Sequence, residues 1–336
     1  LTACAIFLAT AGPAAADGVG PTNYRSVITS VTPRTEGVEV KVLGEDSFLQ
    51  VTAQRGRTVE IPGYDGEPYL RIDKDGKVER NKNSVASYIN NSRSGRVDIP
   101  EGVNSATDPA WDTISTNGSV AWHDHRIHYM ASGTPTVGSD RVVQDWVVPL
   151  TVDGNPVEVE GTLLRNDNVL PWAGLLAIAA GAGALLFLRK FGQGWAGGLM
   201  GAAAVLALGI SISIAVLNPP GSGASPLPLI LPVLALFAGI STRFIPSGKP
   251  PVFRLATLLA AVALLIGWVV PIIGVLWMPN IPSTLPESLI RIGVGLALGT
   301  AVGTAVAVLV WPEAPAGSST GSSTAPNAHP PAPANS

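Results

Sequence analysis

Cysteine is almost absent from this 336-residue sequence, which contains a single one, Cys4. A disulfide needs two thiols and a cysteine-ligated metal centre needs several, so the sequence excludes both within one chain. A folded domain in this protein must therefore be stabilised by its own apolar core, without covalent cross-links.

Charged residues are also scarce, and they are unevenly distributed. Residues 17–168 contain 15 Lys and Arg against 22 Asp and Glu, a net charge of −7, whereas residues 170–311 contain six basic residues and one acidic residue. An acidic domain repels phosphate backbones, which argues against nucleic-acid binding. Because the apolar residues concentrate after position 168, the sequence predicts two physically different halves.

The first sixteen residues, LTACAIFLATAGPAAA, have the pattern of a signal peptide. An apolar run is followed by three small residues, which favours cleavage before Asp17 and export of residues 17–168. The absence of an initiator Met indicates that the natural sequence begins earlier. The alternative is lipidation at Cys4, as in bacterial lipoproteins, but the apolar run that continues past Cys4 favours ordinary cleavage.

Five apolar stretches follow Asn168, each about the ~20 residues that a membrane-spanning helix requires. Basic residues gather after the first stretch and between the third and fourth, and positively charged loops stay in the cytoplasm. This places residues 17–168 outside the cytoplasm and makes residues 312–336, rich in Pro, Ala, Ser, Thr and Gly, a disordered cytoplasmic tail. The predicted five-helix transmembrane domain, 169–311, consists of 170–188, 195–217, 227–244, 254–277 and 289–311.

The predicted helices place no ionisable residue near their centres, which argues against transport, because transported cargo needs polar ligands within the bilayer. Gly295, Gly299 and Gly303 repeat every four residues in the fifth stretch, and Gly197 and Gly201 do so in the second. Such spacing predicts close helix packing, either within the chain or between subunits.

Residues 17–168 have the pattern of an all-β domain. Val38, Val40 and Val42 alternate with polar residues, as do Val157 and Val159, and the turn sequences Asp75-Gly76 and Asp153-Gly154 predict hairpins. A short helix over 84–90 is the one candidate helix in this half. We predict a β-sandwich, immunoglobulin-like in general shape, with its topology left open.

Three of the four histidines lie within six residues, in the segment 122–130, WHDHRIHYM. Imidazole and thioether groups bind copper, and imidazole with carboxylate binds zinc, so His123, His125, His128 and Met130 form a candidate metal site. In a straight strand, however, His123 and His125 would lie on one face and the other two residues on the opposite face, so one site requires a bend or a bulge.

The same segment also has an architectural interpretation. Asp124 and Arg126 would pair on the surface, Trp122 and Ile127 would lie in the core, and the histidine rings would hydrogen-bond neighbouring backbone. A third interpretation is a pH sensor.

The segment WHDHRIHYM, together with GYDGEPYL at 63–70, resembles a group of uncharacterised actinobacterial exported multipass membrane proteins. The resemblance implies the two-part architecture and no activity. A more distant similarity is to periplasmic copper-resistance sandwich proteins attached to copper-uptake helices. This sequence departs from them, because its predicted mature start is Asp17 rather than histidine, it has no methionine-rich stretch, and its helices lack histidine.

No phosphate-binding loop, serine nucleophile elbow or paired-carboxylate motif is present, which argues against an enzyme. The sequence therefore predicts a non-enzymatic envelope protein embedded in the lipid bilayer, whose β domain binds a ligand, with copper and then zinc as the most concrete candidates. The alternative is a structural or interaction module that recruits another envelope protein.

Overall fold

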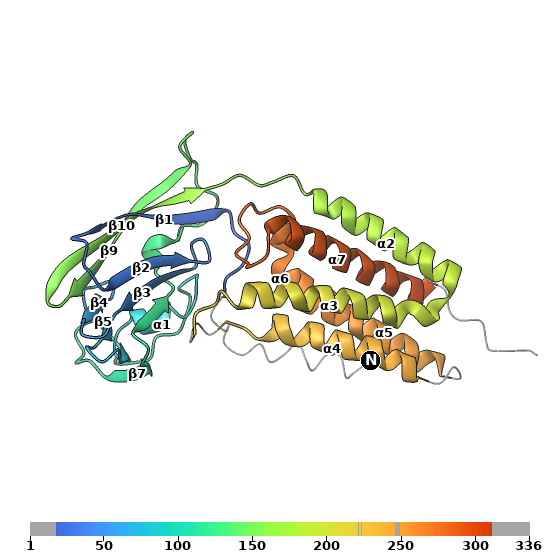
Figure 1. Cartoon of the computed structure of the whole chain (residues 1–336), viewed down its shortest axis with the longest axis horizontal. Coiled ribbons are helices and arrows are strands. Elements are labelled where there is room, and N and C mark those ends of the chain that lie inside the picture. The colour runs from blue at the N-terminus through green and yellow to red at the C-terminus, as the bar shows by residue number, and fades with distance from the viewer. Residues whose placement is uncertain (1–17, 221, 223, 246–248, 311–336) are drawn as a thin grey trace, which may run out of the picture.

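A computed structural model describes residues 18–220, 222, 224–245 and 249–310 (Figure 1). The predicted signal peptide, 1–16, and the predicted disordered tail, 312–336, lie outside the described residues. Within them, a β domain and a bundle of helices lie end to end, and five of the helices are long and apolar enough to span a membrane. The predicted fold class, an all-β domain followed by membrane helices, is confirmed.

Ten antiparallel strands form the β domain in two sheets that share one apolar core. The larger sheet has the order β1 (Tyr24–Thr32), β10 (Asn155–Arg165), β9 (Val142–Val152), β4 (Val59–Pro62), β5 (Pro68–Ile72), β6 (Val78–Asn81) and β7 (Trp111–Ser115). The smaller sheet has the order β2 (Val38–Leu43), β3 (Phe48–Ala53) and β8 (Ser119–Trp122).

The local sequence patterns account for these strands. The two predicted hairpins are present as β5–β6 and β9–β10, and Asp153 and Gly154 both adopt positive φ, at 50° and 79°, as a tight two-residue turn requires. The expected short helix is α1 (Ala86–Ile89). Consecutive strands β7 and β8 belong to different sheets, so the chain crosses from one sheet to the other at the turn 116–118.

The helical part matches the five predicted spans to within a few residues. Its α-helices are α2 (Trp172–Phe191), α3 (Ala196–Ala215), α4 (Leu227–Ser241), α5 (Pro250–Leu264), α6 (Val270–Ile272) and α7 (Glu287–Val310). Short segments adjoin them: the 3₁₀ turns η2 (Gln193–Trp195), η3 (Thr242–Phe244) and η5 (Ile273–Leu276), and the π-helical segment η4 (Leu265–Val269). The π segment precedes Pro271, which has no N–H to continue the α-helical pattern.

The glycine repeats pack helices of the same chain together. A Cβ added to Gly295, Gly299 or Gly303 would meet the backbone of α2, and one added to Gly197 would meet α4. Close backbone approach of this kind needs residues without side chains. The predicted small-residue packing is therefore intramolecular.

The β domain contacts the helix bundle through hydrogen bonds and apolar packing. Thr22 and Asn280 exchange backbone hydrogen bonds of 3.0 and 3.2 Å, and the N–H of Val19 donates to the side chain of Asn218 at 2.8 Å. Phe48 belongs to the same apolar cluster as the buried residues of the bundle. The two parts therefore share a packed junction that includes the loop 279–286.

Candidate functional site

The histidine segment bends directly after strand β8. Asp124 accepts a hydrogen bond from the N–H of Arg126 at 3.0 Å, and the 3₁₀ turn η1 (His125–Ile127) follows. The strand therefore ends at Trp122, and the two-face arrangement of a straight strand does not occur.

The architectural interpretation of this segment is partly correct. Trp122 and Ile127 lie in the core, as expected. Asp124 and Arg126 pair at 2.6 Å, but Asp124 is 0% exposed, so the expectation of a surface pair is wrong. The carboxylate is buried because it also accepts the indole N–H of Trp122 at 2.9 Å, which ties it to the core.

Two of the histidines hold neighbouring loops through their rings. Nδ1 of His123 lies 2.6 Å from the carbonyl oxygen of Ser47, and its ring stacks on Phe48 at 4.1 Å. Nε2 of His125 lies 2.9 Å from the carbonyl oxygen of Ser92. These contacts attach the histidine segment to the β2–β3 turn and to the loop after α1.

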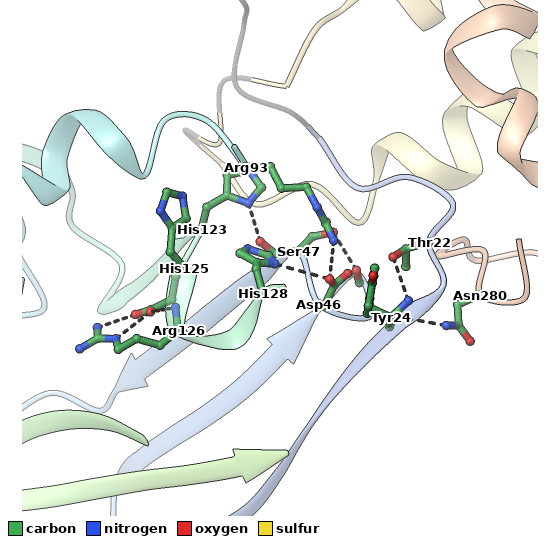
Figure 2. A network of polar contacts seen from close by, with 12 residues as sticks. Thr22, Tyr24, Asp46, Ser47, Arg93, His123, His125, Arg126, His128 and Asn280 are labelled. Carbon is green, nitrogen blue, oxygen red and sulfur yellow. Dashed lines mark hydrogen bonds and ion pairs between the residues drawn. The ribbon is translucent and has the colours of Figure 1, made fainter. Parts of the chain in front are cut away.

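The third histidine, His128, lies in a buried polar network (Figure 2). Its side chain is 1% exposed, and Nδ1 lies 3.5 Å from the Asp46 carboxylate, which is itself ion-paired with Arg93. Nε2 of His128 and Oδ1 of Asp46 are buried without a hydrogen-bond partner. Such orphaned atoms are uncommon in folded proteins, so this position is a candidate for a further ligand.

The pKa values of this pair follow from their surroundings. Burial lowers the pKa of His128 below its ordinary 6.5, despite the adjacent Asp46 carboxylate, so the ring is neutral at pH 7. Burial alone would raise the pKa of Asp46, but Arg93 and His128 lower it below 3.8, so the carboxylate is charged.

The structure brings the three predicted histidine ligands together but not the methionine. The ring of His128 lies 5.8 Å from that of His123 and 6.2 Å from that of His125, between centroids. Met130 is 43% exposed, unlike the buried rings of His123 and His128. Among the described residues, no group of three or more His, Cys, Asp or Glu side chains has an arrangement that would hold a metal ion.

A cavity of about 460 Å³ lies beside this segment, at the junction of the β domain and the helices. We call it the junction cavity. It lies where β7 and β8 separate into different sheets, and the α3–α4 connection borders it. The lining residues come from both parts of the chain: Phe48, Gln50, Tyr69, Leu70, Arg80, Asn90, Asn91, Ile114, Ser115, Asn117, Ser119, Val120, Ala121, Trp122, His123, Pro219, Pro220 and Ser222.

The lining combines aromatic rings with polar side chains, the composition of a small-molecule site. Tyr69 and Trp122 are 4% exposed and form an aromatic wall, with their rings at 81° and centroids 6.5 Å apart. Burial raises the pKa of the Tyr69 hydroxyl, which therefore stays neutral. Gln50, Asn90 and Asn91 add amide groups to the same cavity.

Some residues of the cavity lining belong to sequence motifs, and others carry no sequence signal. Trp122, His123 and Tyr69 stand in the two motifs that the sequence analysis singled out. Arg80 carries no local signal, because it reaches the cavity only through the pairing of β5 with β6. No sequence pattern links the β domain to Pro219 and Pro220, which lie 89 and 90 residues beyond the end of the histidine segment.

No family model, no curated protein and no solved structure matches this chain. The resemblance based on WHDHRIHYM and GYDGEPYL therefore stays a prediction.

Proposed function

We propose that this chain is a non-enzymatic, membrane-anchored binding protein of the cell envelope, whose β domain takes up a small ligand in the junction cavity. The observation that carries the proposal is the cavity itself. Its volume of about 460 Å³ lies within the ~300–1,000 Å³ that small-molecule sites occupy. Aromatic walls with a few convergent polar groups supply binding energy and orientation.

The charge distribution supports an orientation with the β domain outside the cytoplasm. Arg189 and Lys190 lie in the last turn of α2, and Arg243 and Lys249 lie in the connection from α4 to α5. Both connections are at the end of the bundle away from the β domain (Figure 1). Because basic loops remain in the cytoplasm, the β domain belongs on the opposite side.

The proposal is tested by ligand-dependent stabilisation of the full chain in lipid nanodiscs. The probes are a panel of amino acids, nucleotides, sugar phosphates and aromatic acids, each measured by its effect on the unfolding temperature. A compound that binds only the folded state at 100 times its Kd stabilises it by about 2.7 kcal/mol. We expect at least one compound to raise the unfolding temperature of the wild type.

A matched pair of variants tests whether the compound that raises the unfolding temperature binds in the cavity. Gln50→Trp puts an indole into the cavity, whereas Lys41→Trp puts one on the paired strand, outside the cavity lining. Stabilisation that is lost in Gln50→Trp and kept in Lys41→Trp supports the proposal. No stabilising compound, or equal stabilisation of both variants, contradicts it and favours the alternative, a module that recruits another envelope protein.

A second candidate function is metal binding, with copper first and zinc second. It is favoured by the unpartnered Nε2 of His128 and Oδ1 of Asp46 and by the neighbouring rings of His123 and His125. The ring of His125 already has one nitrogen against a carbonyl oxygen, as ligating histidines commonly do. Calorimetric titration of the full chain with Cu(II), Cu(I) and Zn(II) tests this candidate.

The matched variants for that titration are His128→Ala and Met130→Leu. Stoichiometric binding that His128→Ala abolishes would establish a metal site, and its persistence in Met130→Leu would exclude the thioether as a ligand. Binding that both variants retain, or no binding tighter than micromolar, would contradict a histidine metal site.

A further inference from the structure

The junction cavity contains an arginine that points inward from a strand. Arg80 pairs with Leu70 across β5 and β6, and Val78 pairs with Ile72 in the same register. Side chains two residues apart share one face of a strand, and Leu70, Ile72 and Val78 are all buried in the core. The side chain of Arg80 therefore lies on the core-facing side of the sheet, where the sheet borders the cavity.

Arg80 has one acidic register neighbour, the exposed Asp112 on β7, with which it forms no ion pair. Its Nε is buried without a hydrogen-bond partner, and Arg80 takes part in none of the ion pairs of the described residues. The neighbouring Arg71, by contrast, donates to Glu79 at 2.6 Å on the other face of the sheet. A guanidinium in a partly buried position without an anionic partner is unfavourable, because burial removes water that solvates its charge.

The other residues of the cavity lining do not offset the positive charge of Arg80. No Asp or Glu lines the cavity, although residues 17–168 carry a net charge of −7. Acidic side chains are thus absent from the cavity lining, and the acidic register neighbour of Arg80, Asp112, is exposed on β7. The local charge of the cavity is opposite in sign to that of the domain around it.

We propose that the junction cavity binds an anion, a carboxylate or a phosphate group, that pairs with Arg80. The inference rests on the proposed function and names the ligand class of the same cavity. The planar guanidinium donates two parallel hydrogen bonds to such oxygens. Tyr69 and Trp122 provide an apolar surface beside it, so the anionic group belongs to a molecule with a flat or apolar portion.

Two sources supply this chemistry: a soluble metabolite and the headgroup of an anionic lipid. The α3–α4 connection, which contributes Pro219, Pro220 and Ser222 to the cavity, joins two helices of membrane-spanning length. The cavity therefore lies at the ends of two helices of membrane-spanning length, where both lipid headgroups and water can reach it.

The test compares charged and neutral ligands of the same shape. The full chain in phosphatidylcholine nanodiscs is titrated with benzoate, phenyl phosphate and the uncharged benzamide. Hydrogen bonds to charged groups contribute about 1.5–3 kcal/mol, so at least one anion should bind about 10-fold or more tightly than benzamide. Arg80→Gln should remove this preference and Arg80→Lys should retain part of it. The control Arg57→Gln, which removes a charge that pairs with Asp153 on the surface, should leave the preference unchanged.

A second arm distinguishes the two sources. Replacing phosphatidylcholine by phosphatidylglycerol should weaken phenyl phosphate binding at least about 10-fold if the headgroup occupies the site, because the two then compete for Arg80. Native mass spectrometry should then detect a retained phosphatidylglycerol on the wild type and none on Arg80→Gln. Unchanged binding of phenyl phosphate would assign the site to a soluble anion.

Equal binding of benzoate, phenyl phosphate and benzamide would overturn the inference, as would anion binding that Arg80→Gln leaves unchanged. If the uncharged benzamide raises the unfolding temperature of the wild type and loses this effect in Gln50→Trp, the proposed function stands and the anionic ligand fails. If no compound of any charge binds, both fail.

Discussion

Gly299 holds α7 against α2, and its replacement by alanine tests the intramolecular packing. A Cβ at this position would lie closest to the carbonyl oxygen of Ala177, 2.7 Å from the carbonyl carbon and 2.9 Å from the Cα of the same residue, whereas ordinary contacts begin at 3.4 Å. The two backbones would therefore have to separate by more than the ~0.7 Å that would relieve the contact with the carbonyl carbon alone. None of these atoms is the flexible end of a side chain, so the strain cannot be relieved by a rotamer change.

The expected loss follows from two opposing effects. Overpacking of a well-packed interior costs ~1–3 kcal/mol, and a clash with backbone belongs at the upper end of that range. Alanine gains about 1 kcal/mol over glycine in helix propensity. Gly299→Ala should therefore lower the free energy of unfolding by about 2 kcal/mol.

The measurement is reversible unfolding of the purified chain in mixed micelles, followed by far-ultraviolet circular dichroism. Gly183→Ala in α2 is the matched control, because a Cβ there meets nothing within 4 Å. This control should be neutral or slightly stabilising. Equal stability of Gly299→Ala and Gly183→Ala would show that α2 and α7 do not approach closely at this position.

Three further predictions concern the β domain and its junction. Asp46→Ala should lower the free energy of unfolding by about 3 kcal/mol in chemical denaturation, because Arg93 loses its partner in a buried pair; a change below 1 kcal/mol would contradict the pair's role. Burial lowers the pKa of His128 below 6.5, so as the pH falls below 6.5 the imidazole is protonated in the unfolded state before it is protonated in the folded state. The free energy of unfolding should therefore fall by up to about 1.4 kcal/mol per pH unit in this range. His128→Gln should flatten the dependence of the free energy of unfolding on pH between pH 7 and 5.5. Asn280→Ala removes side-chain hydrogen bonds between the two parts and should increase hydrogen exchange at Thr22 relative to the wild type, whereas the exposed Asn104→Ala should not.

The elements of the fold were predictable because their signals are local. The alternation around Val40 and Val159 and the turn at Asp153 need only a few residues to be recognised, and the five spans follow from length and apolar composition. The α2–α7 packing was visible as a glycine repeat, although the sequence did not say which helix the repeat faces.

The candidate site was less predictable because its contacts join distant segments. Asp46, which lies beside His128, is 82 residues earlier in the chain and stands in a turn without any metal-binding pattern. The burial of Asp124 depends on a hydrogen bond from Trp122 that composition does not reveal. The inward position of Arg80 depends on strand register, which hydrophobic patterning does not define for a residue at a strand end.

A crystal structure of the full chain with the tightest-binding compound of the panel tests the proposed ligand site most directly. The ligand should occupy the junction cavity, with an anionic group within hydrogen-bond distance of the Arg80 guanidinium and its apolar part against Trp122. A ligand bound elsewhere on the chain, with the junction cavity unoccupied, would contradict the proposed site.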